Sequence, residues 1–193
     1  TDARDKVLFY VGSRGHHADL GGITPGSMPP DSTSVDQEGI LFDNFHLVDE
    51  GRFQEQAVLD LLASGPNPAR NPQQNIADLK AQIAANEKGV QALHQMADDF
   101  GLDVVHAYMG HVQDNAEESV RRVIDVLKDG SFRCELDNGA VINVAISINR
   151  EQRTARIDFT GTAPQQDNNF NAPTAVCKAA VLYVFRCLVD DDI

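Results

Sequence analysis

The stretch that decides the fold is residues 75–97, NIADLKAQIAANEKGVQALHQMA. Its apolar residues recur at a three-four spacing, which is typical of one face of a helix: they are Ile76, Leu79, Ile83, Val90, Leu93 and Ala97, and Asn86 stands at the missing step. Asn75 is a candidate cap, and Asp78 would lie in the first turn, where the helix dipole favours an acid. The pattern predicts one long helix.

A second helix is predicted to follow at once. Gly101 can end the first helix and Asp103 can cap the second, whose apolar positions run from Val104 to Leu127. Two long helices that are joined by a short loop are expected to form an antiparallel helical hairpin.

Downstream of this hairpin the apolar period changes to two, which indicates strands at 132–136, 141–148 and 155–159. Asn138-Gly139 is a strong signal for a tight turn between the first two. A last helix is predicted from Ala175 to Val189, and Pro173 suits its start. Because this segment is apolar on nearly every side, we expect a buried C-terminal helix.

Upstream, residues 6–12 are rich in β-branched and aromatic side chains and predict a buried strand. A glycine- and proline-rich irregular stretch follows over 13–37, then a second strand over 39–48 and a short helix over 54–63. The predicted class is α+β. We expect one fragment of a single domain, 1–193, with strands and a candidate loop in 1–50, helices in 54–128, a β-meander in 131–162 and a helix in 173–189.

Composition limits the possible functions. The net charge is −13 over 193 residues, which disfavours a nucleic acid or an anionic membrane as partner. No apolar run approaches the ~20 residues that a membrane span needs. The three cysteines have no paired spacing, which indicates a reducing, cytoplasmic setting. The chain begins with Thr1 and ends without a clear stop, so we interpret it as an internal piece of a longer chain.

The most informative loop is Ser13-Arg14-Gly15-His16-His17-Ala18-Asp19-Leu20-Gly21-Gly22. Imidazole and carboxylate groups suit a divalent ion such as Mn, Fe or Zn. In an extended backbone His16 and His17 point to opposite sides, so both could face one ion only if the loop bends, which Gly15 permits. Asp19, three positions past His16, could approach the same point. The residues alone therefore leave two interpretations open, a metal site or an ordinary polar loop. Arg14 could clamp a carboxylate or form a structural ion pair.

Other segments leave similar choices. The glycines at 21, 22 and 26 could bring backbone N–H groups to an anion, or could simply serve turn geometry. Asp158-Phe159-Thr160-Gly161-Thr162 and the helix start at Pro173 could hold an anion or could be capping chemistry. No phosphate-binding P-loop and no Gly-x-Ser-x-Gly nucleophile elbow is present in the sequence.

Several blocks together resemble the hydantoinase B/oxoprolinase family. They are residues 13–22, 24–30 (Thr-Pro-Gly-Ser-Met-Pro-Pro), Gln37-Glu38-Gly39, the run from Asn75 to Asn86, residues 158–162 and Asn171-Ala172-Pro173. Residues 101–111 and 186–189 look most like the hydantoinase B half of ATP-dependent 5-oxoprolinases.

This resemblance implies a cyclic amide hydrolase that uses ATP to open the lactam of 5-oxo-L-proline to L-glutamate, a reaction of glutathione metabolism. The ATP, with Mg, would bind a separate hydantoinase A-like half, and the assembly would be a homo-oligomer. This chain would belong to the hydrolytic half and would be inactive alone. Proteins of the hydantoinase B type that act on hydantoins, and a non-catalytic assembly module, are the alternatives.

The resemblance also implies roles for four residues of the loop. His16 would be a ligand of a divalent metal, and the remaining ligands would lie upstream of Thr1. His17 and Asp19 would be catalytic acid/base groups or would support the ligand, and Arg14 would bind the substrate.

Overall fold

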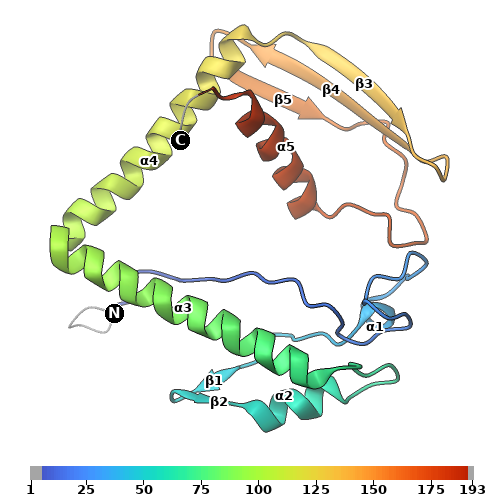
Figure 1. Cartoon of the computed structure of the whole chain (residues 1–193). Helices are drawn as coiled ribbons and strands as arrows, with labels where there is room; N and C mark the ends of the chain where they lie inside the picture. Colours follow the sequence, from blue (N-terminus) through green and yellow to red (C-terminus); the bar gives the residue numbers. More distant parts are fainter. Residues whose placement is uncertain (1–5, 191–193) are drawn as a thin grey trace. The chain divides into compact units, whose positions relative to one another are not determined.

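The computed structural model describes residues 6–190 and divides into two compact units (Figure 1). The first unit comprises the chain up to Phe100 together with Asp167–Phe170. The second comprises Gly101–Gln166 and the chain from Asn171 onward.

The first unit is built on α3, Pro72–Phe100. The shorter elements are α1 (Val35–Glu38), β1 (Val48–Asp49), β2 (Arg52–Phe53) and α2 (Glu55–Leu62), and β1 and β2 form an antiparallel pair. The apolar faces of α2 and α3 meet in the core, where Val58, Leu62, Ile76 and Leu79 are buried. Leu20, Phe42, Phe45, Leu47 and Phe53 pack against this cluster.

Two expectations for this unit are corrected. Residues 6–12 form no strand, because no described segment lies beside them to complete a ladder, and of the strand expected at 39–48 only Val48 is in β1. The long helix is confirmed, but it begins at Pro72, so Asn75 is a buried residue inside the helix rather than its cap. Proline is favoured at a helix start because its missing N–H has no intrahelical acceptor there.

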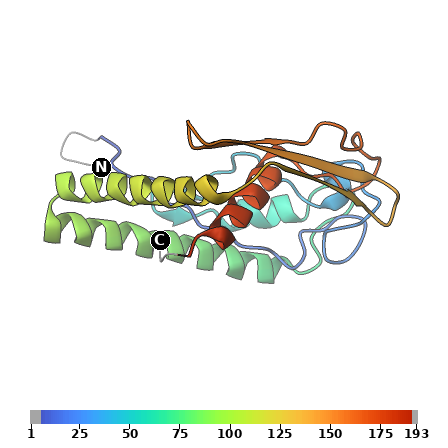
Figure 2. The same cartoon turned by 90° about the horizontal axis from the view of Figure 1, so that it is seen from above.

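The second unit contains α4 (Leu102–Val126), a three-stranded antiparallel sheet and α5 (Thr174–Leu188). The strands are β3 (Gly130–Glu135), β4 (Val141–Asn149) and β5 (Thr154–Asp158), in the order β3-β4-β5. Gly139, at φ +81°, closes the turn that Asn138-Gly139 predicted. Helix α5 contacts α4 and lies against one face of the sheet (Figures 1 and 2).

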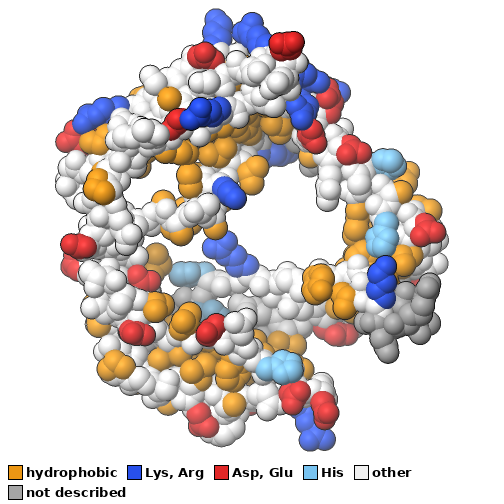
Figure 3. Space-filling model, turned by 180° about the vertical axis from the view of Figure 1, so that it is seen from behind, with side chains coloured by type: hydrophobic (Ala, Val, Ile, Leu, Met, Phe, Trp, Pro, Cys, Tyr) orange, Lys and Arg blue, Asp and Glu red, His pale blue; other side chains and the backbone are white. Residues whose placement is uncertain are grey.

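The expected C-terminal helix is present, but the expectation that it is buried is wrong for the part of the chain that the structure describes. None of its residues is buried, and Leu182 and Tyr183 are 70% and 72% exposed. The reason is that the second unit supplies cover for only one side of α5, at the groove it shares with Ile157 and Phe159. Figure 3 shows hydrophobic side chains gathered at the surface beside the sheet.

The start of α4 differs from the expectation, and the predicted helix pair spans both units. Gly101 precedes α4, so Asp103 lies in the first turn of the helix and does not cap it. Helices α3 and α4 are both present, but they belong to different units. Their packing as a hairpin therefore stays a prediction.

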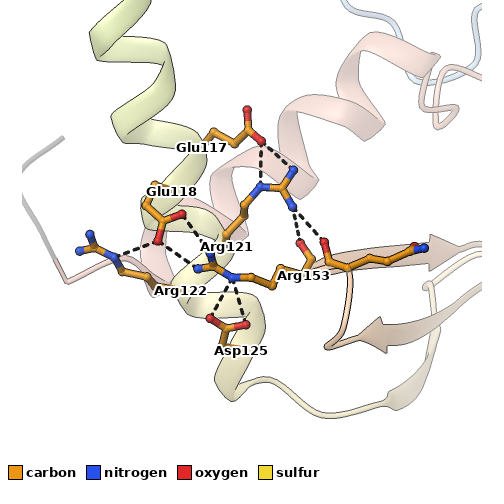
Figure 4. A network of polar contacts seen from close by, with 7 residues as sticks. Glu117, Glu118, Arg121, Arg122, Asp125 and Arg153 are labelled. Carbon is orange, nitrogen blue, oxygen red and sulfur yellow. Dashed lines mark hydrogen bonds and ion pairs between the residues drawn. The ribbon is translucent and has the colours of Figure 1, made fainter.

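An ion-pair network ties the turn between β4 and β5 to α4 (Figure 4). The Arg153 guanidinium lies 3.0 Å from both the Glu118 and the Asp125 carboxylates. Arg121 donates to the carbonyl oxygens of Gln152 and Arg153. Hydrogen bonding from Arg153 lowers the pKa of the Glu118 carboxyl. This network fixes the sheet on α4 even though Arg153 is held at a positive φ of 52°.

No helix among residues 6–190 is long and apolar enough to cross a bilayer.

Candidate active-site loop

The segment that precedes the glycine-rich loop runs along α3 in the opposite direction, within the first unit. Val11 lies against Gly89, Gly15 lies against Gln82, and His17 reaches Asn75. From Val11 to Gly15 the helix covers seven residues, about 10 Å at ~1.5 Å each, and the segment four, about 13 Å at ~3.3 Å each. These lengths match a nearly extended chain laid along a helix.

Side chains of this segment alternate in direction. The odd-numbered residues face α3: Val11 touches Gly89, Ser13 donates to the Gln82 carbonyl oxygen at 3.2 Å, and His17 packs on the helix. Tyr10, Gly12, Arg14 and His16 are exposed, and among the described residues the structure records no contact between them and α3, whereas Ser13 and Gly15 are exposed but still touch Gln82. From Val11 to His17 the contacts with α3 thus fall on odd-numbered residues, as expected of an extended backbone, with His17 on the helix and His16 exposed.

His17 is the inward-facing histidine, and only 11% of its side chain is exposed. Its Nδ1 lies 3.4 Å from the Asn75 amide nitrogen and 3.6 Å from a carboxylate oxygen of Asp78. Its Nε2 lies 3.4 Å from the Gln82 amide nitrogen. Both ring nitrogens therefore face groups of α3.

Asp19 organises the loop that follows. One carboxylate oxygen accepts from the backbone N–H of Gly21 at 2.8 Å and of Arg70 at 3.3 Å. The other accepts from the Gly26 N–H at 3.0 Å and from the Arg70 guanidinium at 2.9 Å. Burial raises the pKa of Asp19, but these hydrogen bonds outweigh it and hold the pKa below its ordinary value. Such a carboxylate is a weak base whose oxygens already have donors.

The glycines of the loop are explained by backbone geometry. Gly21 and Gly22 have φ values of +90° and +89°, and a Cβ at either would collide with backbone, of Asn67 at Gly21 and of Glu38 at Gly22. The Gly22 N–H donates to the Asn67 carbonyl oxygen. Their N–H groups therefore serve the loop itself, as do those that Asp19 accepts, and none is left for an anion.

The described residues, 6–190, contain no group of three or more His, Cys, Asp and Glu side chains that could hold a metal ion. His16 is exposed whereas His17 packs on α3, and Asp19 is occupied by Arg70 and the loop amides. The residues present therefore do not form a metal site by themselves. At most, His16 can supply one ligand.

The second candidate segment, 158–162, lies in the other unit and shows ordinary turn chemistry. Asp158 accepts from the Thr160 N–H at 2.8 Å and from Arg156 at 2.9 Å. The hydrogen bonds from Thr160, with the Arg156 charge, lower the pKa of Asp158. The Thr162 hydroxyl accepts from the Asn143 backbone N–H at 3.1 Å and donates to the Asn143 carbonyl oxygen at 3.0 Å. These contacts account for the motif without a bound anion.

Sequence reasoning missed the residues that hold the loop. The motifs did not single out Arg70, and they assigned Asn75 and Asp78 only to the helix start. The signal was present in the spacing of the polar residues 75, 78, 82 and 86, which repeat at the helical period like the apolar ones beside them.

Comparisons with known proteins bear on this loop and on the whole chain. The sequence model of the family described as Hydantoinase B/oxoprolinase matches residues 2–193. A 5-oxoprolinase of Dictyostelium discoideum is 43% identical over 98% of this chain, and 5-oxoprolinase 1 of Arabidopsis thaliana is 40% identical over 98%. The B-type component of a putative D-/L-hydantoinase of Pseudomonas sp. is 30% identical over 88%.

The chain is short beside these relatives. It spans 15% and 17% of the two 5-oxoprolinases and 30% of the hydantoinase component. Among solved structures, the ATP-dependent caprolactamase from Pseudomonas jessenii matches with a TM-score of 0.72, over 93% of this chain and 31% of that chain. At 22% identity this likeness shows a shared fold.

Proposed function

The chain belongs to the hydantoinase B/oxoprolinase family, and we propose that the protein containing it is an ATP-dependent 5-oxoprolinase that opens 5-oxo-L-proline to L-glutamate. The observation that carries this proposal is the level of identity: 5-oxoprolinases reach 43% and 40%, against 30% for a hydantoinase component. The activity is that of the whole protein, of which this chain is one part.

The proposed reaction explains why ATP is needed. An unstrained lactam is an amide, and water attacks an amide slowly at neutral pH because resonance stabilises the carbonyl. Phosphorylation of the lactam oxygen by ATP removes the amide resonance, so water can add to the ring carbon. The C–N bond then breaks, the nitrogen leaves as the amine, and an acyl phosphate forms. Its hydrolysis releases phosphate and leaves L-glutamate. We assign the phosphorylation to a hydantoinase A-like partner half that binds ATP with Mg, and the attack of water to the half that contains this chain.

Arg14 and His16 support this assignment because they project from the same side of the segment. Residues two apart in an extended chain are separated by about 7 Å at ~3.3 Å per residue. This spacing suits a small ligand that carries a carboxylate and a reacting carbonyl on one ring. Arg14 would bind the carboxylate of oxoproline through paired N–H groups, which is the geometry that a guanidinium offers.

His16 is proposed to contribute one ligand to a divalent ion such as Mn, Fe or Zn. Because the described residues do not complete such a site, its other ligands would come from other parts of the protein. Asp19, which the resemblance assigned to acid–base catalysis, is better suited to holding the loop, since its oxygens are engaged by Gly21, Gly26 and Arg70.

The role of Arg14 is tested with the full-length enzyme and two substrates. Arg14→Ala should raise KM for 5-oxoproline and should leave the weak turnover of 2-pyrrolidinone, the same lactam without the carboxylate, unchanged. Arg52→Ala, an exposed arginine of β2, is the matched control and should alter neither. An equal loss with both lactams would show that Arg14 does not bind the carboxylate.

The alternatives predict different results. A hydantoinase would turn over a hydantoin in preference to oxoproline in a substrate panel. A non-catalytic assembly module would show altered assembly, with turnover per complex intact, after alanine substitution of residues 14–19. Loss of bound metal in His16→Ala, measured as metal per polypeptide, would support the ligand role, and wild-type turnover in that variant would refute it.

Cellular setting and assembly are part of the same proposal. The described cysteines, Cys134, Cys177 and Cys187, are all unpaired, as in a reducing compartment. These thiols support a cytoplasmic setting, and the resemblance to 5-oxoprolinases supports a homo-oligomer that serves glutathione metabolism. Sedimentation of the full-length enzyme would test the oligomer, and a single monomeric species would refute it.

A further inference from the structure

A row of polar side chains runs along the face of α3 that meets the loop. Asn75, Asp78, Gln82 and Asn86 follow one another at steps of three and four residues, so they lie on one side of the helix. Asn75 is 2% exposed, and among the described residues its amide oxygen and that of Asn86 are buried without a partner. Burial of an amide costs free energy unless the amide is hydrogen-bonded, so we infer that the row serves to bind the segment that packs on it.

The His17 ring sits on this row with polar groups of α3 at both of its nitrogens. Its Nδ1 lies 3.4 Å from the Asn75 amide nitrogen and 3.6 Å from a carboxylate oxygen of Asp78, and its Nε2 lies 3.4 Å from the Gln82 amide nitrogen. A carboxylate pairs with a protonated ring nitrogen, and an NH2 group donates to an unprotonated one. Asp78 is in turn held by Gln74, whose amide donates to its other oxygen at 2.8 Å.

The same helix face also fixes the backbone on either side of His17. The Asn75 amide donates to the Asp19 carbonyl oxygen at 2.8 Å, and Ser13 donates to the Gln82 carbonyl oxygen. The segment is thus tied to α3 before and after His17. A shift of one residue would turn His16 inward and His17 outward, because side chains alternate along an extended chain.

We infer that His17 is a positioning residue, held on α3 by Asp78 and Gln82, and that this contact sets the register that turns Arg14 and His16 outward. Both of its ring nitrogens face groups of the helix, which favours a positioning role over direct chemistry. The contact itself follows from geometry within the first unit, whereas its consequence for turnover rests on the proposed function.

The holding contact is tested by histidine footprinting of the full-length enzyme with diethyl pyrocarbonate. Trypsin cuts after Arg14 and Arg52, so one peptide carries His16, His17 and His46. His46, whose side chain is 78% exposed, is the internal reference. We expect His17 to be modified much more slowly than His46 in the wild type.

Substitutions in the row should release His17. Asp78→Asn, which keeps the shape of the side chain, and Gln82→Ala should each bring its modification rate toward that of His46. The matched controls are Asp98→Asn and Gln91→Ala, an exposed acid and an exposed amide of the same helix, and they should leave His17 protected. Fast modification of wild-type His17, or continued protection in both test variants, would overturn the inference.

A kinetic cycle tests the consequence for turnover. If Asp78 acts through His17, Asp78→Asn and His17→Ala should each lower kcat about 10–100-fold, the usual range for residues that orient a reacting group. The double variant should be no worse than His17→Ala alone, and additive losses would overturn the positioning role. Absence of oxoproline turnover in the wild type would refute the proposed function instead, and the footprint would still decide whether α3 holds His17.

Discussion

Replacing Asp19 by asparagine should open the glycine-rich loop, because the carboxylate serves donors on both of its oxygens. In Asp19→Asn one oxygen becomes an NH2 group that faces the donors it replaces, either Gly26 N–H and the Arg70 guanidinium or Gly21 and Arg70 N–H. A hydrogen bond to a charged group contributes about 1.5–3 kcal/mol. The side chain is only 16% exposed, so water replaces these partners incompletely.

We therefore expect Asp19→Asn to lower the local stability of the loop by about 2–4 kcal/mol. At about 1.4 kcal/mol per tenfold change, this corresponds to roughly 30- to 700-fold faster hydrogen exchange of the amides at Gly21 and Gly26. The assay is hydrogen exchange with mass spectrometry on the full-length enzyme, using peptides that cover 20–27. Asp36→Asn, an exposed acid of α1, is the control. Wild-type exchange of these amides in Asp19→Asn would refute the reasoning.

Three further outcomes are expected. Because the folded pKa of Asp19 is lowered, its carboxylate should protect the loop amides fully at pH values above the ordinary aspartate pKa. This protection should be lost as the pH falls through the folded pKa, and hydrogen exchange in Asp19→Asn should lack this pH dependence. Gly15→Ala should reduce turnover of the full-length enzyme because a Cβ there displaces the Gln82 amide, which also faces His17. Gly12→Ala, with open space around it, should be silent. Leu62→Ala should destabilise the core by about 2–5 kcal/mol, seen as faster exchange in α2, since Leu62 is fully buried.

The helices and the meander could be predicted because their signals are local. The three-four spacing from Ile76 onward and the period of two on either side of Asn138-Gly139 each depend on residues that lie close together in sequence. The prediction of a strand at residues 6–12 failed because a strand needs a neighbouring strand to pair with, and composition alone does not supply one. The prediction that α5 is buried failed for the same reason: an apolar helix is covered only where another element lies against it.

The candidate loop was found from sequence, but which of its residues hold the loop and which face outward was not. An extended backbone predicted that His16 and His17 face opposite sides unless Gly15 bends the loop, and in the structure His17 packs on α3 while His16 is exposed. Which histidine faces outward depends on contacts between residues more than 50 positions apart, such as His17 with Asn75 and Asp19 with Arg70. The spacing of residues within the loop does not predict those contacts.

Two glycines explain why the segment adopts this register and not its neighbour. Gly15 passes directly over the Gln82 side chain, and Val11 passes over Gly89, so each close approach uses a residue without a Cβ. A shift by one residue would place Arg14 or His16 over Gln82, where a single Cβ already collides. The competing register therefore requires the Gln82 side chain to move, in addition to the loss of the His17 contacts. The outward direction of His16 thus follows from a glycine next to it and a glutamine far along the chain, neither of which needs to touch a substrate.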